Sequence, residues 1–295
     1  MKLARVQVQG SGKTHLALID EQRQEAALVG GDWGAHPNPV LAIIQQDVTA
    51  TQLNAAVTER VALSRVKFLS PLSAFLRNPF AVGKNYHDHA LEFDKSGFNA
   101  TTGGASAIPE FPQIFTKATT TLSGPSDAIR FNPKHTSSVD YEGEIGVVIG
   151  AACRNVSKAD AMNHVFGFVA MNDVTARDLQ KNHAQWFLGK SLDGFCPLGP
   201  WITTRDESPT DMHMQTWVNG ELRQSAHISQ LIFDVPTLIE TMSAAMTLLP
   251  GDIIATGTSV GVGIGFKPPK FLRHGDVVRV AISGLGELNN PVEET

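Results

Sequence analysis

The chain has 295 residues, of which 42% are hydrophobic and 18% are charged, and its formal net charge is -5 at pH 7. A chain of this length and apolar content can bury a sizeable core, in one large domain or in a large domain with a small companion. The mildly acidic charge is spread along the chain without a basic block, so we expect no nucleic-acid partner.

The cysteines and the apolar runs indicate the compartment. Cys153 and Cys196 are the only two cysteines and lie far apart in the sequence. This argues against a disulfide framework and fits a reducing compartment. The first ten residues, MKLARVQVQG, alternate instead of forming a signal peptide, and no apolar run approaches membrane-spanning length. We therefore expect a soluble cytoplasmic protein with no membrane partner.

The beginning of the chain has the pattern of a small α+β domain. Alternation predicts two strands, at 2–10 and 15–20, and helical spacing predicts one helix, at 49–64. A proline-punctuated passage, 68–83, then leads into a second domain. We divide the chain into a small N-terminal domain, residues 1–72, and a larger domain, residues 73–295.

The larger domain consists mainly of short apolar strands separated by turn signals. The strand candidates are 113–122, 128–131, 141–150, 165–174, 251–257 and 275–284. The helix candidates are 157–165, 175–188 and 235–248. Residues 93–110 are rich in Gly, Ala, Ser and Thr, which predicts a mobile loop that can close over a site. The whole pattern predicts a strand-dominated α+β fold.

Three glycine-containing segments resemble nucleotide-binding loops but lack a required residue. The segment GSGKTH needs an earlier glycine where Gln7 stands, and LGKS needs one where Ala184 stands. The segment GVGIGF lacks the third glycine of a dinucleotide fingerprint. The sequence also has no HExxH, no GxSxG and no paired CxxC. Nucleotide binding and serine-hydrolase chemistry are therefore set aside.

Residues 139–150, VDYEGEIGVVIG, place acids in an otherwise buried strand pattern. Alternation puts Asp140, Glu142 and Glu144 on one face and apolar side chains on the other. Two carboxylates about 4 Å apart repel by roughly 4 kcal/mol at an effective dielectric near 20. The acidic face is therefore either solvated, as on a half-exposed strand, or in contact with a cation.

A third acid, Asp173, follows the apolar run VFGFVAM and so falls near a strand end, where site residues are common. Thr175 and Asp178 match a T-x-x-D capping box, which leaves Asp173 free for a role other than a helix N-cap. With Glu142 and Glu144 it forms an all-oxygen set. No Cys or His accompanies these acids, so the set suits Mg²⁺ or Mn²⁺ and not zinc.

Two basic side chains are further candidates. If a helical turn begins near Asp88, His89 and Glu92 lie three residues apart on one face, and a carboxylate-oriented imidazole can act as a general base. The alternative is a surface histidine with a chance acidic neighbour. Lys190 lies between an apolar segment and a turn, where a lysine usually has an anionic partner; the alternative is a lysine that extends to the surface.

A set of segments follows in order along the chain: GKNYHDHALEF, DYEGEIGVVIG, NDVTARDLQ, GKSLDGFCPLGPW, LLPGDIIATGT, and GVG followed by KPP and GDVV. This ordered set resembles the fumarylacetoacetate hydrolase family, in the branch of acylpyruvate hydrolases and 2-hydroxyhepta-2,4-diene-1,7-dioate isomerases. The resemblance runs from about Ala81 to the end of the sequence. It implies a mixed β-roll as the larger domain, a homodimer, and one Mg²⁺ or Mn²⁺ ion per subunit.

The same resemblance implies roles for individual positions. The family's metal ligands correspond to Glu142, Glu144 and Asp173. Its water-activating pair and its oxyanion-stabilising lysine correspond to His89, Glu92 and Lys190. Its substrate-binding positions correspond to Tyr86, Arg177, Gln180 and Thr258. One position departs from the family pattern, because the usual GTP appears as GTS with Ser259, which changes the turn after Thr258.

The expected reaction is metal-dependent hydrolysis of a carbon–carbon bond in a 2,4-diketo acid such as an acylpyruvate or fumarylpyruvate. The His89–Glu92 pair favours hydrolysis, since decarboxylation needs no attacking water. The same site would also suit an oxaloacetate decarboxylase, an unsaturated keto-acid isomerase or a ureidoglycolate lyase. An alternative of another class is a non-catalytic protein that binds a divalent ion.

Overall fold

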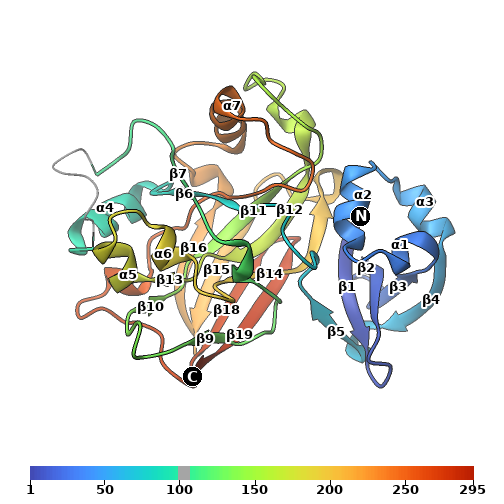
Figure 1. Cartoon of the computed structure of the whole chain (residues 1–295), viewed down its shortest axis with the longest axis horizontal. Helices are drawn as coiled ribbons and strands as arrows, with labels where there is room; N and C mark the ends of the chain where they lie inside the picture. Colours follow the sequence, from blue (N-terminus) through green and yellow to red (C-terminus); the bar gives the residue numbers. More distant parts are fainter. Residues whose placement is uncertain (99–106) are drawn as a thin grey trace.

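The computed structural model describes residues 1–98 and 107–295. The first strands and helices form one side of the molecule, coloured blue in Figure 1. The strands are β1 (Lys2–Val8), β2 (Thr14–Asp20), β3 (Glu25–Val29), β4 (Val57–Ala62) and β5 (Val66–Leu69). The helices are α1 (Gly31–Ala35), α2 (Pro39–Gln45) and α3 (Ala50–Ala55), followed by the 3-10 turn η1 (Leu63–Arg65).

The helix predicted over 49–64 is only half correct. Helix α3 begins after Thr49, whose hydroxyl accepts from the backbone of Gln52 while the Gln52 side chain accepts from the backbone of Thr49. From Val57 the chain is strand β4, which pairs with β3 and buries Val61. Pairing with a neighbouring strand overrides the helical spacing of this stretch.

One sheet of 12 strands joins the two ends of the molecule. Its order is β4-β3-β2-β1-β14-β12-β11-β17-β6-β7, with β5 on β1 and β8 on β14. The later strands are β6 (Phe80–Gly83), β7 (Gln113–Thr116), β8 (Leu122–Ser123), β11 (Gly143–Ile149), β12 (Val165–Asn172), β14 (Cys196–Thr204) and β17 (Ile253–Ala255). The link is the pairing of β1 with β14, at Lys2 with Thr203 and Leu3 with Ile202.

A second sheet of five strands packs against the first, in the order β16-β15-β18-β19-β9. Its strands are β9 (Ile129–Phe131), β15 (His213–Val218), β16 (Glu221–His227), β18 (Val277–Ile282) and β19 (Gly286–Glu294). A short pair, β10 (Val139–Asp140) with β13 (Thr175–Ala176), lies apart from both. The remaining 3-10 turns are η2 (Thr119–Thr121), η3 (Ala161–His164), η4 (Arg205–Glu207), η5 (Ile228–Gln230) and η6 (Gly263–Gly265).

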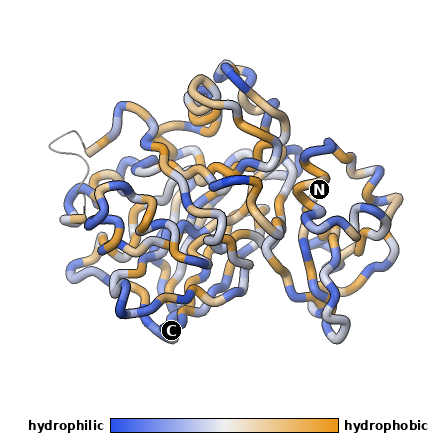
Figure 2. The backbone as a smooth tube through the Cα atoms, in the orientation of Figure 1, coloured by the Kyte–Doolittle hydropathy of each residue, from blue (hydrophilic) through white to orange (hydrophobic). Residues whose placement is uncertain are grey.

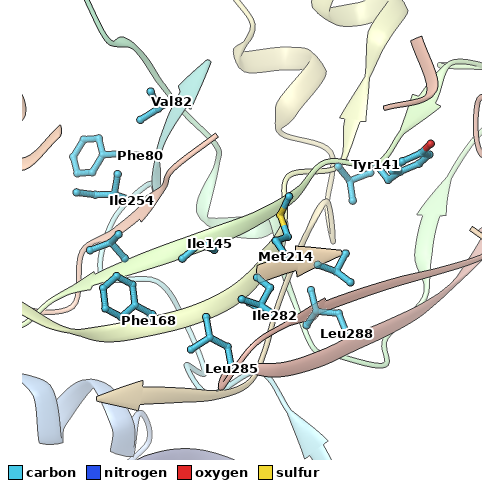
Figure 3. Packing of buried hydrophobic residues seen from close by; sticks show 14 of the residues in the cluster. Phe80, Val82, Tyr141, Ile145, Phe168, Met214, Ile254, Ile282, Leu285 and Leu288 are labelled. Atoms are coloured by element: carbon cyan, nitrogen blue, oxygen red, sulfur yellow. The ribbon is translucent and has the colours of Figure 1, made fainter. Parts of the chain in front are cut away.

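The main core lies between the two sheets. Figure 3 shows Ile145 and Phe168 of the large sheet near Met214, Ile282 and Leu288 of the small one. The opposite face of the large sheet is also covered, because Val148 and Val169 belong to a second buried cluster that includes residues of α2. Strands β11 and β12 are therefore buried on both faces, which explains their nearly continuous apolar sequences.

The helices after residue 73 differ from those that the sequence pattern predicts. They are α4 (His87–Lys95), α5 (Arg177–Asn182), α6 (Phe187–Lys190) and α7 (Val235–Ala245). The stretch 175–188 splits into α5 and α6 at Ala184, whose φ of 53° is left-handed. The stretch 157–165 contains only the turn η3. The loop predicted at 93–110 begins later than expected, because α4 continues to Lys95, and its central residues lie outside the described part of the chain.

The strand-dominated α+β fold predicted from the sequence is confirmed. Figure 2 shows hydrophobic segments through the middle of the molecule and mainly hydrophilic outer loops, as expected for a buried core. Within residues 1–98 and 107–295, no helix has both the length and the apolar character needed to cross a membrane.

Candidate metal centre and active site

Three acids meet where β11 begins and β12 ends. Glu144 is on β11, Glu142 precedes that strand, and Asp173 directly follows β12. The pairing of Gly143 with Asn172 brings the two strand ends together, and the backbone N–H of Asp173 donates to the carbonyl of Glu142 at 2.8 Å. One carboxylate oxygen from each acid lies within 4.8 Å of the other two.

These acids are buried, so the solvated-face alternative is wrong. Glu142 is 5% exposed and Glu144 is 1% exposed. Burial, together with the charges of Asp173 and Glu142, raises the pKa of Glu144 well above its ordinary value. Burial would also raise the pKa of Glu142, but Lys190, Arg177 and His89 lower it to about 2. The two neighbouring glutamates thus have opposite pKa shifts.

Two cations hold Glu142. Lys190 Nζ lies 2.6 Å from Glu142 Oε2 and 2.7 Å from Asp173 Oδ2, and Arg177 Nη2 lies 2.6 Å from Glu142 Oε1. Burial alone would lower the pKa of Lys190, but Asp173 and Glu142 raise it above its ordinary value. Lys190 is 2% exposed, which rules out a lysine that extends to the surface.

A third cation, Lys117, was not predicted from the sequence. It follows β7, is fully buried, and its Nζ lies 2.6 Å from Asp173 Oδ1. The reasoning applied to Lys190 would have found it, since Lys117 also follows an apolar strand without reaching solvent. Both oxygens of Asp173 thus contact an ammonium group.

Glu144 is the acid that fits a metal ion best. Among the described residues no lysine or arginine forms an ion pair with it, and its Oε2 accepts only from the backbone N–H of Gly257, at 2.7 Å. A buried carboxylate without a counter-charge is costly, and a divalent cation would compensate it. The three acids supply oxygen ligands only, which is the donor set of Mg²⁺ and Mn²⁺.

Asp140 does not join the three acids, although strand alternation would place it on their face. Its Oδ2 accepts from Arg177 Nε at 2.8 Å and its Oδ1 accepts from the backbone N–H of Gly263 at 2.6 Å. The chain leaves strand geometry between β10 and β11, so Asp140 turns toward η6. Asp140 therefore holds Arg177 in place and does not join Glu142, Glu144 and Asp173 as a fourth acid.

The His89–Glu92 pair lies on α4 beside the acids. His89 Nδ1 is 3.3 Å from Glu92 Oε2, and the backbone N–H of Gly261 donates to Glu92 Oε1 at 3.1 Å. His89 is 4% exposed, so the surface-histidine alternative is wrong. His89 lines the same cavity as Glu142 and Glu144.

A small cavity opens between these groups. The predicted residues that line it are His89, Glu142, Glu144, Arg177, Gln180, Lys190 and Thr258. Glu92 and Asp173 contact lining residues from behind. Tyr86 is buried beside them but does not line the cavity; burial and the charge of Glu144 raise the pKa of its phenol. Lining residues that were not predicted include Lys84, Phe93, Phe115 and Trp186.

Two polar groups of the lining are held by neighbours. Thr258 Oγ1 donates to the carbonyl of Gly143 at 2.9 Å and accepts from Gln224 Nε2 at 2.7 Å. Gln180 Oε1 accepts from Arg177 Nη1 at 3.1 Å. These contacts fix the orientation of both side chains before any ligand enters.

The predicted capping box of α5 is not formed. Thr175 Oγ1 donates to the carbonyl of Asp173 at 2.9 Å, and α5 has no side-chain cap. Asp178 instead accepts from Thr136 Oγ1 at 2.6 Å. The short strand β13, which includes Thr175, pairs with β10, so Thr175 is unavailable as a cap.

The fold and the buried acids define the class: a strand-dominated α+β protein whose site can hold a divalent ion beside a His–Glu pair. The chain matches the family model described as fumarylacetoacetate (FAA) hydrolase C-terminal over residues 78–293. It therefore belongs to the fumarylacetoacetate hydrolase family, which is a family of enzymes.

Three relatives show the range of activities in this family. Oxaloacetate tautomerase YisK of Bacillus subtilis (strain 168) is 48% identical over 233 residues, 78% of this chain and 74% of that protein. The structure of fumarylacetoacetate hydrolase from psychrophilic Exiguobacterium antarcticum is 39% identical, with a TM-score of 0.83 over 100% of both chains. That of maleylpyruvate hydrolase from Sphingobium sp. SYK-6 is 30% identical, with a TM-score of 0.79 over 100% of both chains.

Proposed function

We propose that this protein is an Mg²⁺- or Mn²⁺-dependent enzyme that interconverts the keto and enol forms of an oxaloacetate-like 2-keto acid. The observation that carries this proposal is the buried His89–Glu92 pair beside the acid group Glu142, Glu144 and Asp173. The 48% identity to an oxaloacetate tautomerase supports it.

The three acids would hold the divalent ion, and that ion would polarise the 2-keto oxygen and so increase the acidity of the hydrogens on the neighbouring carbon. The remaining roles in the site are filled by side chains of the protein. Lys190 is buried and charged beside the same acids, so it can stabilise negative charge that develops on the keto oxygen. Arg177, fixed by Asp140, and Gln180 form the wall that orients the acid.

His89 would carry the proton. Its Nδ1 faces Glu92, which accepts a hydrogen bond from that nitrogen and so leaves Nε2 as the nitrogen that exchanges a proton with the substrate. Removal of the proton from the carbon beside the keto group and its return to oxygen converts the ketone into the enol. Glu92 stabilises the imidazolium form between the two transfers, while the backbone of Gly261 holds Glu92 in place.

A second candidate is hydrolysis of the carbon–carbon bond in a 2,4-diketo acid, the reaction expected from the sequence. The 39% identity to a fumarylacetoacetate hydrolase and the 30% identity to a maleylpyruvate hydrolase, each over the full chains, favour it. In this reaction His89 would take a proton from water, which attacks the distal carbonyl carbon. The same residues serve both reactions, so the choice depends on whether a water or only the substrate lies beside His89.

The test follows enol-oxaloacetate absorbance in chelator-stripped protein, with and without added Mg²⁺ or Mn²⁺. We expect metal-dependent acceleration of ketonisation without pyruvate formation. Pyruvate release from oxaloacetate would instead identify a decarboxylase, and loss of acetylpyruvate absorbance would identify the hydrolase.

The matched variants are His89→Ala and Lys95→Gln, the latter at an exposed position of the same helix. His89→Ala should abolish turnover and keep metal binding, whereas Lys95→Gln should change neither. If wild-type protein binds the metal but accelerates none of these reactions, the proposal is wrong.

A further inference from the structure

Lys84 is a buried lysine in the wall of the cavity that the proposed reaction does not use. It follows β6, at the turn into α4, and is 3% exposed. It lines the same cavity as His89 and Lys190.

The ammonium group of Lys84 has no hydrogen-bond partner among the described residues. Its Nζ lies 5.4 Å from the ring centroid of Phe93, and the charge of Asp94 acts on it from nearby. By contrast, Arg177 and Lys190, the other long cations of the cavity, are paired with Glu142, Asp140 or Asp173. Buried polar groups nearly always have partners, so an unpaired ammonium in a cavity wall indicates a missing anion.

The backbone at Lys84 holds this ammonium in place at a conformational cost. Its φ of 54° is in the left-handed region, which residues with a Cβ adopt uncommonly. The next residue fixes the turn: Asn85 Nδ2 donates to the carbonyls of Phe233 and Thr256, and Asn85 Oδ1 accepts from the N–H of Phe233. The position of Lys84 is therefore set by the fold and not by its own contacts.

The cavity lining contains two chemically different groups of side chains. The acids would hold the divalent ion and, with it, the keto-acid end of the substrate. The aromatic side chains of Phe93 and Trp186 have ring centroids 5.8 Å apart, and Lys84 Nζ lies 5.4 Å from the ring centroid of Phe93. A second carboxylate on the substrate would be repelled by the acids and would find a free cation only at Lys84, among the described residues that line the cavity.

We infer that Lys84 binds the distal carboxylate of the substrate, so that the enzyme selects dicarboxylic 2-keto acids over monocarboxylic ones. This inference rests on the proposed function. Burial lowers the pKa of Lys84, while the charge of Asp94 opposes that shift. A bound carboxylate would raise the pKa of the ammonium again and so favour the paired form.

The test is calorimetric binding of two anions to the Mn²⁺-loaded protein. Oxalate carries only the part of the substrate that would meet the ion, whereas 3,3-difluorooxaloacetate adds a distal carboxylate and cannot enolise because it has no hydrogen on that carbon. We expect Lys84→Gln to weaken difluorooxaloacetate binding about tenfold to a hundredfold, the range for one charged hydrogen bond. Oxalate binding should be unchanged, Lys84→Arg should restore part of the loss, and Lys95→Gln should change neither affinity.

The outcomes separate this inference from the proposed function. Equal weakening of both anions by Lys84→Gln would assign Lys84 a general structural role and overturn the inference, as would unchanged affinity for both. Failure of the wild-type protein to bind either anion with Mn²⁺ present would overturn the proposed function itself. Thermal unfolding of each variant confirms that the comparison is made on folded protein.

Discussion

Lys117 Nζ and Lys190 Nζ contact opposite oxygens of Asp173, at 2.6 Å and 2.7 Å. All three side chains are at most 2% exposed. Asp173 is therefore clamped between two ammonium groups that reach it from different parts of the chain. Lys190 also contacts Glu142, whereas the other contact of Lys117 is the carbonyl of Val174. Asp173 is thus the acid with which Lys117 forms its ion pair.

Replacement of Lys117 by Met should destabilise the metal-free protein by about 3–5 kcal/mol, because loss of one partner leaves a buried carboxylate poorly compensated. Urea unfolding measures this change. The control is Lys67→Met, at an exposed lysine whose change should stay within about 0.5 kcal/mol. An equal effect of the two substitutions would show that the clamp contributes nothing to stability.

Replacement of Glu144 by Gln should separate metal binding from folding. The amide side chain would keep an acceptor for the N–H of Gly257 and remove the buried charge, so the metal-free protein should lose no more than about 1 kcal/mol of stability. The rise in melting temperature that Mn²⁺ produces in wild-type protein should disappear. A variant that Mn²⁺ still stabilises as strongly as wild type would exclude Glu144 as a ligand.

Metal affinity should rise with pH. The folded protein holds the Glu144 proton more tightly than the unfolded chain does, because the pKa of Glu144 is raised. Stability of the metal-free protein is therefore lost as pH rises above the ordinary pKa of glutamate, about 4.3, toward the folded value. Mn²⁺ must displace the same proton, so calorimetric titrations of wild-type protein in buffers of different ionisation enthalpy should detect proton release on Mn²⁺ binding.

The pKa of Glu142 is shifted in the opposite direction, so its contribution to stability has the opposite dependence on pH. Its pKa is lowered to about 2, so its contribution to stability is present above the ordinary glutamate pKa and is lost as pH falls toward 2. Acid unfolding of Glu142→Gln should therefore show a shallower loss of stability between about pH 4 and pH 2 than that of wild type. Identical acid-unfolding curves would show that Glu142 is not paired in this way.

Replacement of Glu92 by Gln should lower kcat by about 10²-fold or more and leave Mn²⁺ affinity unchanged, because Glu92 supports the imidazolium of His89 and contacts none of the three acids. The amide can still accept from the backbone of Gly261, so the variant should fold. Steady-state kinetics with parallel Mn²⁺ titration measure both quantities. Loss of metal affinity together with activity would indicate a disturbed site instead of a missing acid–base partner.

Gly189 permits the close contact between α5 and α6 that places Lys190. A Cβ at Gly189 would lie 2.5 Å from the backbone nitrogen of Gln180 and 2.7 Å from the carbonyl oxygen of Ala176. Gly189→Ala should therefore cost about 1–3 kcal/mol and lower activity by moving Lys190 away from the acids. Leu188→Ala, at a side chain 49% exposed, is the control that should keep both properties.

The sequence predicted the candidate site residues that lie in short, recognisable segments. It did not predict the residues whose role depends on a partner far away in the sequence. The group Glu142, Glu144 and Asp173 was visible because strand ends and hard oxygen ligands follow simple rules. Lys84 and Lys117 were missed. The rule applied to Lys190 would have marked Lys117 as a candidate, but only the folded sheet shows that its partner is Asp173 and that Lys84 has no hydrogen-bond partner among the described residues. Helix boundaries failed for a similar reason: strand pairing and a left-handed residue, both set by tertiary packing, decide where a helical pattern stops.

The apolar cluster on the back of the large sheet ties the leading segment to the chemistry. Leu3, Ile43 and Ile44 pack in one cluster with Val148 of β11 and Met171 of β12, the strands that carry Glu144 and lead into Asp173. Residues 1–72 are thus not an exchangeable attachment. A change in the leading segment during evolution must be matched by a change on this sheet face, so the two parts should diverge together. A chimaera that joins the two parts from distant relatives should lose activity even though it retains the three acids.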